Sequence, residues 1–262
     1  MPRTEFFESA VKHGFYGVDK AGLFGKKDNV RKYWEDVSIK LSIRPAIERI
    51  LEHKERIRIV DLGCGSGEGV ELLTHIPPSN PVKTIDKEFV TAEDDIELYK
   101  GVDISPAMVE QGKHNYSGLP QVEFVQGDLS EGFPFMKDDP YDIYFSSYAS
   151  ESHLTFEELE HLTQDIFSHI GDRGYMVFDL YGRNSPEWPK YWGKDCHATL
   201  PYTMAYLLPP QERSPEKIEW FDVTYWKGSE LVGLIETAAK SAKRKAKIII
   251  MRDRSIFVGR HM

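Results

Sequence analysis

The sequence predicts an α/β fold, built as a doubly wound and mostly parallel sheet with helices on both faces. Short apolar runs alternate with amphipathic segments from residue 57 onward, which is typical of repeated strand–helix–strand units. The first apolar run leads directly into a glycine-rich turn, the position where such folds bind ligands. A chain of 262 residues is long enough to form one such domain with elaborations.

Apolar runs and periodic segments locate the individual elements. The predicted strands are residues 57–62, 98–104, 122–126, 141–146 and 175–180, and the predicted helices between them are residues 67–75, 106–116 and 156–170. Residues 30–53 carry apolar side chains at three- and four-residue steps and predict an earlier helix, in which Pro45 is a potential break point. Residues 247–262 predict two strands around residues 252–255, and therefore a C-terminal antiparallel hairpin.

Composition narrows the class of partner. With 33 basic and 42 acidic residues the formal charge is -9, so nucleic acid is not an expected partner. The longest aliphatic run, residues 248–251, is far too short to cross a membrane, and residues 1–10 do not resemble a signal peptide. Cys64 and Cys196 form neither a disulfide framework nor a zinc spacing, and no metal site is expected among the histidines. We therefore expect a cytoplasmic protein.

Two stretches are longer than the connections of the predicted fold require. Residues 77–97 are rich in prolines and acids and predict an excursion on the surface. Residues 181–226 contain six prolines and four of the five tryptophans. Because tryptophan and proline often shape pockets and interfaces, we expect this second insertion to line a binding site rather than only to cover the core.

The turn after the first strand carries the most information about ligands. Its glycines, Gly63, Gly65 and Gly67, allow a tight turn and a close approach of the backbone to a ligand. A dinucleotide fingerprint would need a glycine at position 68, where this chain has Glu68. No Gly-Lys-Ser/Thr follows, which excludes a nucleoside-triphosphate loop.

The sequence Asp-Leu-Gly-Cys-Gly-Ser-Gly at residues 61–67 resembles the first motif of class I S-adenosylmethionine-dependent methyltransferases. The later motifs of that family follow in order at residues 101–108, 125–129, 141–147 and 174–179, so the resemblance covers about residues 57–180 and the C-terminal hairpin. It implies a Rossmann-like methyltransferase fold with a seven-stranded sheet. It also implies S-adenosyl-L-methionine as cofactor and S-adenosyl-L-homocysteine as product.

The resemblance divides the chain and implies roles for individual residues. Residues 1–50 are expected to be a helical lid segment, and residues 51–262 the cofactor-binding domain. Asp103 is expected to bind the ribose hydroxyls, Asp61 the amino-acid tail and Asp128 the adenine amine, the alternative for each being a structural cap. The other expected cofactor-binding residues are Gly63, Cys64, Gly65, Gly67, Ile104, Met108, Gly127, Leu129 and Ser146, with Tyr16 and Trp34 as an aromatic lid.

The acceptor side is expected after the fourth strand, in residues 146–154. His153 is the first candidate for a general base and Glu151 the second. The alternatives are that His153 packs beside the next helix and that Glu151 is a solvated loop residue. An Asn/Asp-Pro-Pro-Tyr motif is absent, which argues against methylation of nucleobase amines or glutamine. The sequence also lacks the acids of a magnesium-dependent site.

These observations predict an enzyme that methylates a small organic molecule at nitrogen, oxygen or carbon. Two other hypotheses remain open, a methyltransferase acting on protein or RNA and a non-catalytic protein that binds the same cofactor. Residues 240–247 hold five basic side chains, which we interpret as the solvated end of a helix. The sequence leaves open the acceptor, the need for a general base, the oligomeric state and the roles of both insertions.

Overall fold

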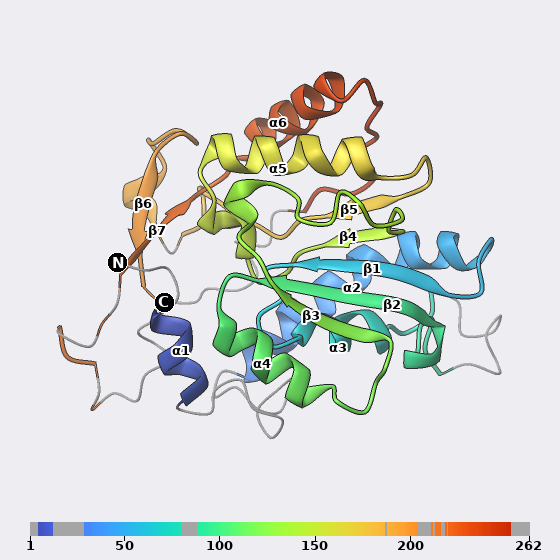
Figure 1. Cartoon of the computed structure of the whole chain (residues 1–262). Coiled ribbons are helices and arrows are strands. Elements are labelled where there is room, and N and C mark those ends of the chain that lie inside the picture. Colours follow the sequence, from blue (N-terminus) through green and yellow to red (C-terminus); the bar gives the residue numbers. More distant parts are fainter. Residues whose placement is uncertain are drawn as a thin grey trace.

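The computed structural model describes residues 5–12, 29–79, 88–186, 188–203, 211, 213–215, 218 and 220–252. Its main sheet has five parallel strands in the order β3-β2-β1-β4-β5 (Figure 1). These strands are β1 (Ile57–Leu62), β2 (Ile96–Asp103), β3 (Val122–Gln126), β4 (Ile143–Phe145) and β5 (Tyr175–Val177). A separate antiparallel pair consists of β6 (Thr199–Tyr202) and β7 (Phe221–Thr224).

Helices cover both faces of the main sheet. Figure 1 shows α5 and α6 on one face and α2, α3 and α4 on the other. The α-helices are α1 (Glu5–Lys12), α2 (Asn29–Leu51), α3 (Glu68–Thr74), α4 (Pro106–Asn115), α5 (Phe156–His169) and α6 (Gly228–Ser241). The short 3-10 helices are η2 (Glu93–Asp95), η3 (Leu129–Glu131), η4 (Ser150–His153) and η5 (Pro189–Tyr191). The predicted doubly wound α/β fold is therefore confirmed in its main features.

Alternation along β1 shows how the sequence specifies the two faces. Ile57 and Ile59 pack in one apolar cluster with residues of α2 and α3, whereas Val60 and Leu62 pack in another with residues of α5 and α6. Successive side chains of a strand point to opposite faces, so a strand covered on both sides must be apolar at nearly every position. The run Ile-Arg-Ile-Val-Asp-Leu meets this requirement except at its two polar residues.

Strand order places the candidate site. β1 pairs with β2 on one side and with β4 on the other, both in parallel. The chain therefore reverses its direction of winding at β1, and ligands of such sheets bind beyond the carboxyl ends of the strands at this point. In Figure 1, α1, β6 and β7 lie beyond this same edge of the sheet.

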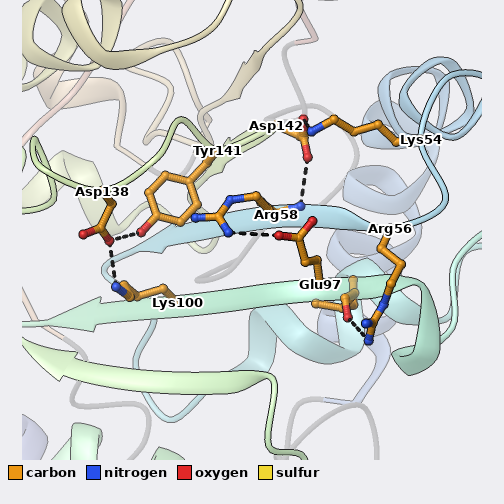
Figure 2. A network of polar contacts seen from close by, with 9 residues as sticks. Lys54, Arg56, Arg58, Glu97, Lys100, Asp138, Tyr141 and Asp142 are labelled. Carbon is orange, nitrogen blue, oxygen red and sulfur yellow. Dashed lines mark hydrogen bonds and ion pairs between the residues drawn. The ribbon is translucent and has the colours of Figure 1, made fainter.

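A network of polar contacts joins the amino ends of β1 and β4 and extends to Lys100 in the second half of β2 (Figure 2). Asp142 accepts hydrogen bonds from Lys54 Nζ at 2.7 Å and from the Arg58 backbone N–H at 2.9 Å. Asp138 accepts from Lys100 Nζ at 2.7 Å and from Tyr141 Oη at 2.6 Å. Ion pairs at the protein surface contribute little individually to the free energy of unfolding. The network lies away from the carboxyl edge that carries the candidate site, and we assign to it the alignment of the strands.

The predicted seven-stranded sheet is wrong, because the main sheet has five strands in the part of the chain that the structure describes. Two more strands exist, but they lie in the second insertion and pair only with each other. An apolar run shows that a segment favours burial, yet it does not show which edge the segment pairs with.

The predicted C-terminal hairpin is not formed by the described residues 244–252, which contain no strand; residues 253–262 lie outside the described residues. Residues 244–252 and α2 line a groove of 1460 Å³ beside β5. Ile249 and Met251 are 46% and 48% exposed there. Apolar character alone predicts strands in this segment, but the described residues 244–252 have no strand to pair with.

Two further observations concern the helices. α2 continues through Pro45 without ending, so the potential break point is not used. Among the helices described here, none combines the length and the apolar character that crossing a membrane requires.

Candidate functional site

The glycine turn links β1 to α3 at the carboxyl edge of the sheet. Gly63, Gly65 and Gly67 adopt positive φ angles of 69°, 55° and 97°, a conformation that side chains with a Cβ atom rarely take. The backbone N–H groups of Gly63 and Cys64 donate to the Val102 carbonyl at 2.9 and 3.0 Å. The turn is thereby fixed to the end of β2.

Neighbouring elements pack against these glycines so closely that no side chain would fit. A Cβ atom on Gly63 would lie 2.5 Å from the Cβ atom of Ser150 in η4. One on Gly67 would lie 2.5 Å from the Tyr116 ring and 2.7 Å from the Phe124 ring. The turn therefore needs glycine for space as well as for backbone conformation.

Asp103, at the end of β2, holds the turn from the other side. Its carboxylate accepts hydrogen bonds from the backbone N–H groups of Gly65 and Ser105, each at 2.9 Å. Burial raises the pKa of Asp103. Ile104 follows, and Ser105 caps α4 by accepting from the Met108 N–H at 3.4 Å. Each oxygen of a carboxylate accepts more than one hydrogen bond, so Asp103 retains capacity for a ligand.

Asp61 is buried beneath the turn, at only 1% exposure. One carboxylate oxygen accepts a hydrogen bond from Tyr99 Oη, and the other, Oδ1, has no hydrogen-bond partner. Burial raises the pKa of Asp61 to about 8, and the negative charge of Glu68 adds to the rise. Burial likewise raises the pKa of the Cys64 thiol, so this cysteine is not a reactive thiolate.

Asp128 lies after β3, in the Gly-Asp turn. Its Oδ1 atom accepts from the backbone N–H of Ser130 at 2.9 Å and from its hydroxyl at 2.7 Å, so Asp128 caps η3. The Gly127 N–H donates to the Asp103 carbonyl at 3.0 Å, which brings this turn beside the end of β2. Leu129 packs at the edge of the apolar cluster beneath α5 and α6.

The segment after β4 contains a buried acid, Glu151, which is the second candidate for a general base. Glu151 is fully buried in η4, where its Oε2 atom accepts a hydrogen bond from Ser146 Oγ. Its Oε1 atom has no hydrogen-bond partner. Burial raises the pKa of Glu151 to about 8, and the charges of Asp61 and Asp179 add to the rise. The alternative of a solvated loop glutamate is therefore wrong.

The turn between β4 and η4 is held in an unusual conformation. Tyr148 and Ala149 both have positive φ angles, 54° and 62°, although neither is glycine. The Tyr148 backbone N–H donates to Asp179 at 3.0 Å, and its hydroxyl donates to Asp36 in α2. Strain of this kind persists only where surrounding contacts enforce it, and such strain is concentrated at functional sites. Sequence reasoning missed Tyr148, Asp36 and Asp179 because no local pattern marks them.

His153, at the end of η4, lies between two aromatic rings. Its ring centroid is 4.8 Å from that of Phe221 in β7 and 6.3 Å from that of Phe7 in α1. His153 therefore stands where the N-terminal segment and the second insertion meet the segment after β4.

The second insertion forms an aromatic cluster on this side of the molecule. The Tyr181 N–H donates to Ser152 Oγ at 2.8 Å, and Thr224 Oγ1 donates to the Leu154 carbonyl at 2.7 Å. These bonds attach the insertion to η4. We call the following buried residues the aromatic cluster: Met108, Ala149, Tyr181, Trp188, Tyr191, Tyr202, Val223 and Tyr225.

Two expected lid residues are not placed. Tyr16 lies outside the described residues, and Trp34 lies in α2 without a described side chain. Among the described residues, no group of three or more histidine, cysteine, aspartate or glutamate side chains is arranged to hold a metal ion.

Part of the chain is similar to known proteins. Residues 59–174 match the family described as "Methyltransferase domain". The chain is 24% identical over 193 residues to a trans-aconitate 2-methyltransferase of Klebsiella pneumoniae (strain 342), an alignment that covers 72% of this chain and 63% of the relative. The chain thus matches less than two thirds of that relative's length.

One solved structure shares the fold, and a second is similar to a smaller extent. A complex between the Haloferax volcanii Trm112 methyltransferase activator and a methyltransferase matches with a TM-score of 0.54 and 19% identity, over 91% of this chain and 77% of that one. An S-adenosylmethionine-dependent methyltransferase from Clostridium acetobutylicum ATCC 824 gives a TM-score of 0.49 and 14% identity, over 79% and 80%.

Over residues 59–174, the fold and the glycine turn resemble those of a class I S-adenosylmethionine-dependent methyltransferase domain. S-adenosyl-L-methionine is the cofactor of that class of domain.

The residues present fit this cofactor. S-adenosylmethionine carries a positively charged amine and a sulfonium, and both favour a site that is rich in carboxylates. Asp61 Oδ1 is a buried carboxylate oxygen without a partner, and a buried polar atom of this kind is stabilised when a ligand donates to it. The glycine turn supplies close access to the backbone, since a Cβ atom on Gly63 or Gly67 would collide with its neighbours.

Proposed function

We propose that this chain transfers the methyl group of S-adenosylmethionine to a small-molecule acceptor. The observation that carries the proposal is the aromatic cluster, which the second insertion builds onto Met108 of α4 and Ala149 beside η4. Three residues of the cluster, Ala149, Tyr181 and Trp188, also line the groove beside β5, and pockets for small molecules are lined mainly by apolar and aromatic groups.

Each proposed cofactor contact follows from a position at the carboxyl edge of the sheet. Asp103 would accept hydrogen bonds from the ribose hydroxyls while it holds Gly65 in place. Asp61 would accept from the amine of the amino-acid tail. Asp128 would accept from the adenine amine through the oxygen that does not cap η3. When bound, the cofactor supplies an activated methyl group on a sulfonium.

The remaining task of the protein is to position the acceptor and to exclude water. Methyl transfer is an in-line displacement, so correct placement of two reactants supplies much of the rate enhancement. α1 packs against α4, and Phe7 and Val11 of α1 contact the aromatic cluster. We assign to this helix the role of covering the site, in agreement with the lid expected for residues 1–50.

Two side chains of η4 are proposed to act on the acceptor. Histidine is the side chain that most readily takes up and gives back a proton near neutral pH, which suits His153 to act as a base, and its ring lies beside Phe221. Glu151 is buried next to Ser146 and has one oxygen available. A base is needed only if the acceptor carries a proton that must leave.

The curated relative is named for a small-molecule substrate, trans-aconitate, which supports a small acceptor for this chain as well. A macromolecular acceptor is the second candidate, because the Haloferax volcanii neighbour is found in complex with a methyltransferase activator. The formal charge of -9 argues against RNA as the acceptor. A cytoplasmic location also stays a prediction.

The test is a methyl-transfer assay with the purified chain. The chain is incubated with labelled S-adenosylmethionine and, in parallel, with a small-molecule fraction, total RNA or a protein extract. We expect label to enter the small-molecule fraction. Label in RNA or protein alone would replace the proposal by the macromolecular hypothesis. Cofactor binding without transfer in any arm would favour the non-catalytic hypothesis.

A further inference from the structure

We propose that the acceptor is an amine carried on an apolar, ring-bearing body, and that Glu151 takes the proton which this amine releases. This inference rests on the proposed function and specifies the substrate class of the same site. It is carried by a buried carboxylate with one unpartnered oxygen, whose neighbours in η4 contact aromatic residues of the second insertion.

The first observation is the state of Glu151. The side chain is 0% exposed, Ser146 donates to Oε2, and Oε1 has no partner. An unsatisfied buried acceptor is unfavourable unless a ligand supplies the donor, and a carboxylate binds a positively charged N–H donor most strongly. Asp61 and Asp179 lie near enough to add their negative charges. The surroundings therefore favour a cation or a strong N–H donor.

The second observation is the position of the aromatic cluster relative to η4. η4 carries Glu151, and its neighbours Ser152 and His153 contact Tyr181 and Phe221 of the insertion. Tyr181 continues into the aromatic cluster, with ring centroids 5.0 Å from Tyr202 and 5.7 Å from Tyr225. Aromatic faces attract ammonium groups as well as apolar bodies. An amine on a ring-bearing body would place its ammonium group at the Glu151 carboxylate and its ring against the aromatic cluster.

The third observation concerns the cations. In the part of the chain that the structure describes, Arg183 is the one arginine or lysine that is buried. All three of its guanidinium nitrogens are engaged, with Glu230 and with the carbonyls of Tyr225 and Lys194. Arg183 is therefore not available to pair with a substrate carboxylate. An acceptor acid such as trans-aconitate would meet the carboxylates of Glu151 and Asp179 without a described buried cation to balance it.

The chemical step balances with these groups. An alkylamine is mostly protonated at neutral pH, and its ammonium proton passes to Glu151 Oε1, which frees the nitrogen lone pair. That lone pair forms the new bond to the methyl carbon while the bond between sulfur and this carbon breaks and leaves its electron pair on sulfur. The products are the methylated ammonium and the neutral thioether S-adenosylhomocysteine, and Glu151 then returns the proton to solvent.

The experiment compares acceptors that share a body and differ in one group. The intact chain is given labelled S-adenosylmethionine with one of three sets: 2-phenylethylamine and tryptamine, the matching alcohols, or the matching propanoic acids together with trans-aconitate. We expect label in N-methylated products of the amine set, at a rate at least about 100-fold above the other sets, since general-base assistance contributes about 10²–10⁴-fold.

Two variants locate the base. Glu151→Gln is expected to lower kcat for the amine by about 10²–10⁴-fold and to remove the acidic limb of the pH–rate profile. Glu157→Gln changes an exposed glutamate on α5 and serves as the matched control, with kcat unchanged. Calorimetric binding of S-adenosylhomocysteine shows that each variant is folded. If Glu151→Gln does not fold, the comparison of the three acceptor sets with the unaltered chain decides alone.

The outcomes separate this inference from the function on which it rests. Cofactor binding with transfer to the alcohols or acids, or with no transfer to the amines, overturns the amine assignment and leaves the methyltransferase proposal to its own test. If the pH–rate profile of Glu151→Gln equals that of the unaltered chain, Glu151 is not the base. Failure to bind the cofactor at all would contradict the proposed function itself.

Discussion

Asp61 lies near the carboxyl end of β1, and Glu151 lies in η4, which follows the adjacent strand β4. Both are buried, each accepts one hydrogen bond from a hydroxyl, and each keeps one oxygen without a partner. Burial raises the pKa of each to about 8. The unliganded site therefore holds protons at neutral pH, whereas a bound cation would favour the ionised carboxylates and lower both pKa values.

This linkage predicts that S-adenosylmethionine binding releases protons at pH 7. The sign follows because the free carboxyls are mostly protonated below a pKa of about 8, and a positive ligand shifts them toward ionisation. Calorimetric titrations in buffers of different ionisation enthalpy measure the number of protons released. In Asp61→Asn the release should be smaller. Proton uptake, or no exchange of protons with the buffer, would contradict this account of the two acids.

Asp103 supplies a second prediction at the scale of one residue. Asp103→Asn is expected to weaken cofactor binding by about 2–4 kcal/mol, because hydrogen bonds to a charged group contribute about 1.5–3 kcal/mol each and are not additive. The substitution also weakens the bonds from the Gly65 and Ser105 N–H groups. Titration calorimetry on the folded variant is the measurement. Unchanged affinity would show that the ribose lies elsewhere.

At the scale of elements, the site depends on how the glycine turn and η4 fit together. Ser150 Oγ donates to the Gly63 carbonyl at 2.8 Å, and its Cβ atom occupies the space that a side chain at Gly63 would need. On the other side of the turn, Tyr116 and Phe124 stack with ring centroids 5.9 Å apart and pack against Gly67. The turn is thus enclosed by three elements that are distant in sequence.

Gly67→Ala tests this packing. The substitution places a Cβ atom at a φ of 97° and within 2.5 Å of the Tyr116 ring. Strain and overpacking together should lower the free energy of unfolding by about 2–4 kcal/mol and weaken cofactor binding. Gly118→Ala is the control, because a Cβ atom there meets nothing within 4 Å. Equal unfolding midpoints for the two variants in urea would refute the packing argument.

The sequence predicted most elements of the sheet because their signals are local. The residues of β1 and β3 have the predicted bounds, and the glycine turn follows β1 as expected. The pairing of β6 with β7, in contrast, joins residues 199–202 to residues 221–224, and no local pattern specifies a partner so far along the chain. The expected seven-stranded sheet came from the family resemblance and not from residues that define an edge.

The site, like the sheet, could be predicted only where its signals are local in the sequence. The family resemblance implied the roles of Asp61, Asp103 and the glycines, and the structure places these residues together at the carboxyl edge of the sheet. The burial of Glu151 depends on packing between η4 and distant segments. Likewise, the left-handed turn at Tyr148 depends on Asp36 and Asp179, which lie in other elements.

At the scale of the whole molecule, one buried ion pair joins the second insertion to the body of the fold. Arg183 is 1% exposed and forms a two-bond ion pair with Glu230 of α6, while its other bonds reach the carbonyls of Tyr225 and Lys194. The Arg183 N–H also donates to the Trp226 carbonyl at 2.9 Å. These contacts fix both ends of the insertion that builds the aromatic cluster.

Arg183→Met should therefore loosen the insertion. Removing one partner of a buried ion pair leaves the other charge uncompensated and costs about 3–5 kcal/mol, with the lower end expected because Glu230 is 22% exposed. Urea unfolding of Arg183→Met and of the exposed control Arg173→Met provides the comparison. We expect the acceptor KM to rise for Arg183→Met, with cofactor affinity nearly unchanged. Equal stability of both variants would exclude this role for Arg183.

The central claim is that the turn at Gly63, Gly65 and Gly67, with Asp61 and Asp103, forms an S-adenosylmethionine site. Titration calorimetry of the purified chain with S-adenosylmethionine, S-adenosylhomocysteine and NAD tests it most directly. The account predicts 1:1 binding of the first two ligands, abolished or strongly weakened in Asp103→Asn, and no comparable binding of NAD. Tight binding of NAD, or no binding of S-adenosylmethionine to the folded chain, would contradict it.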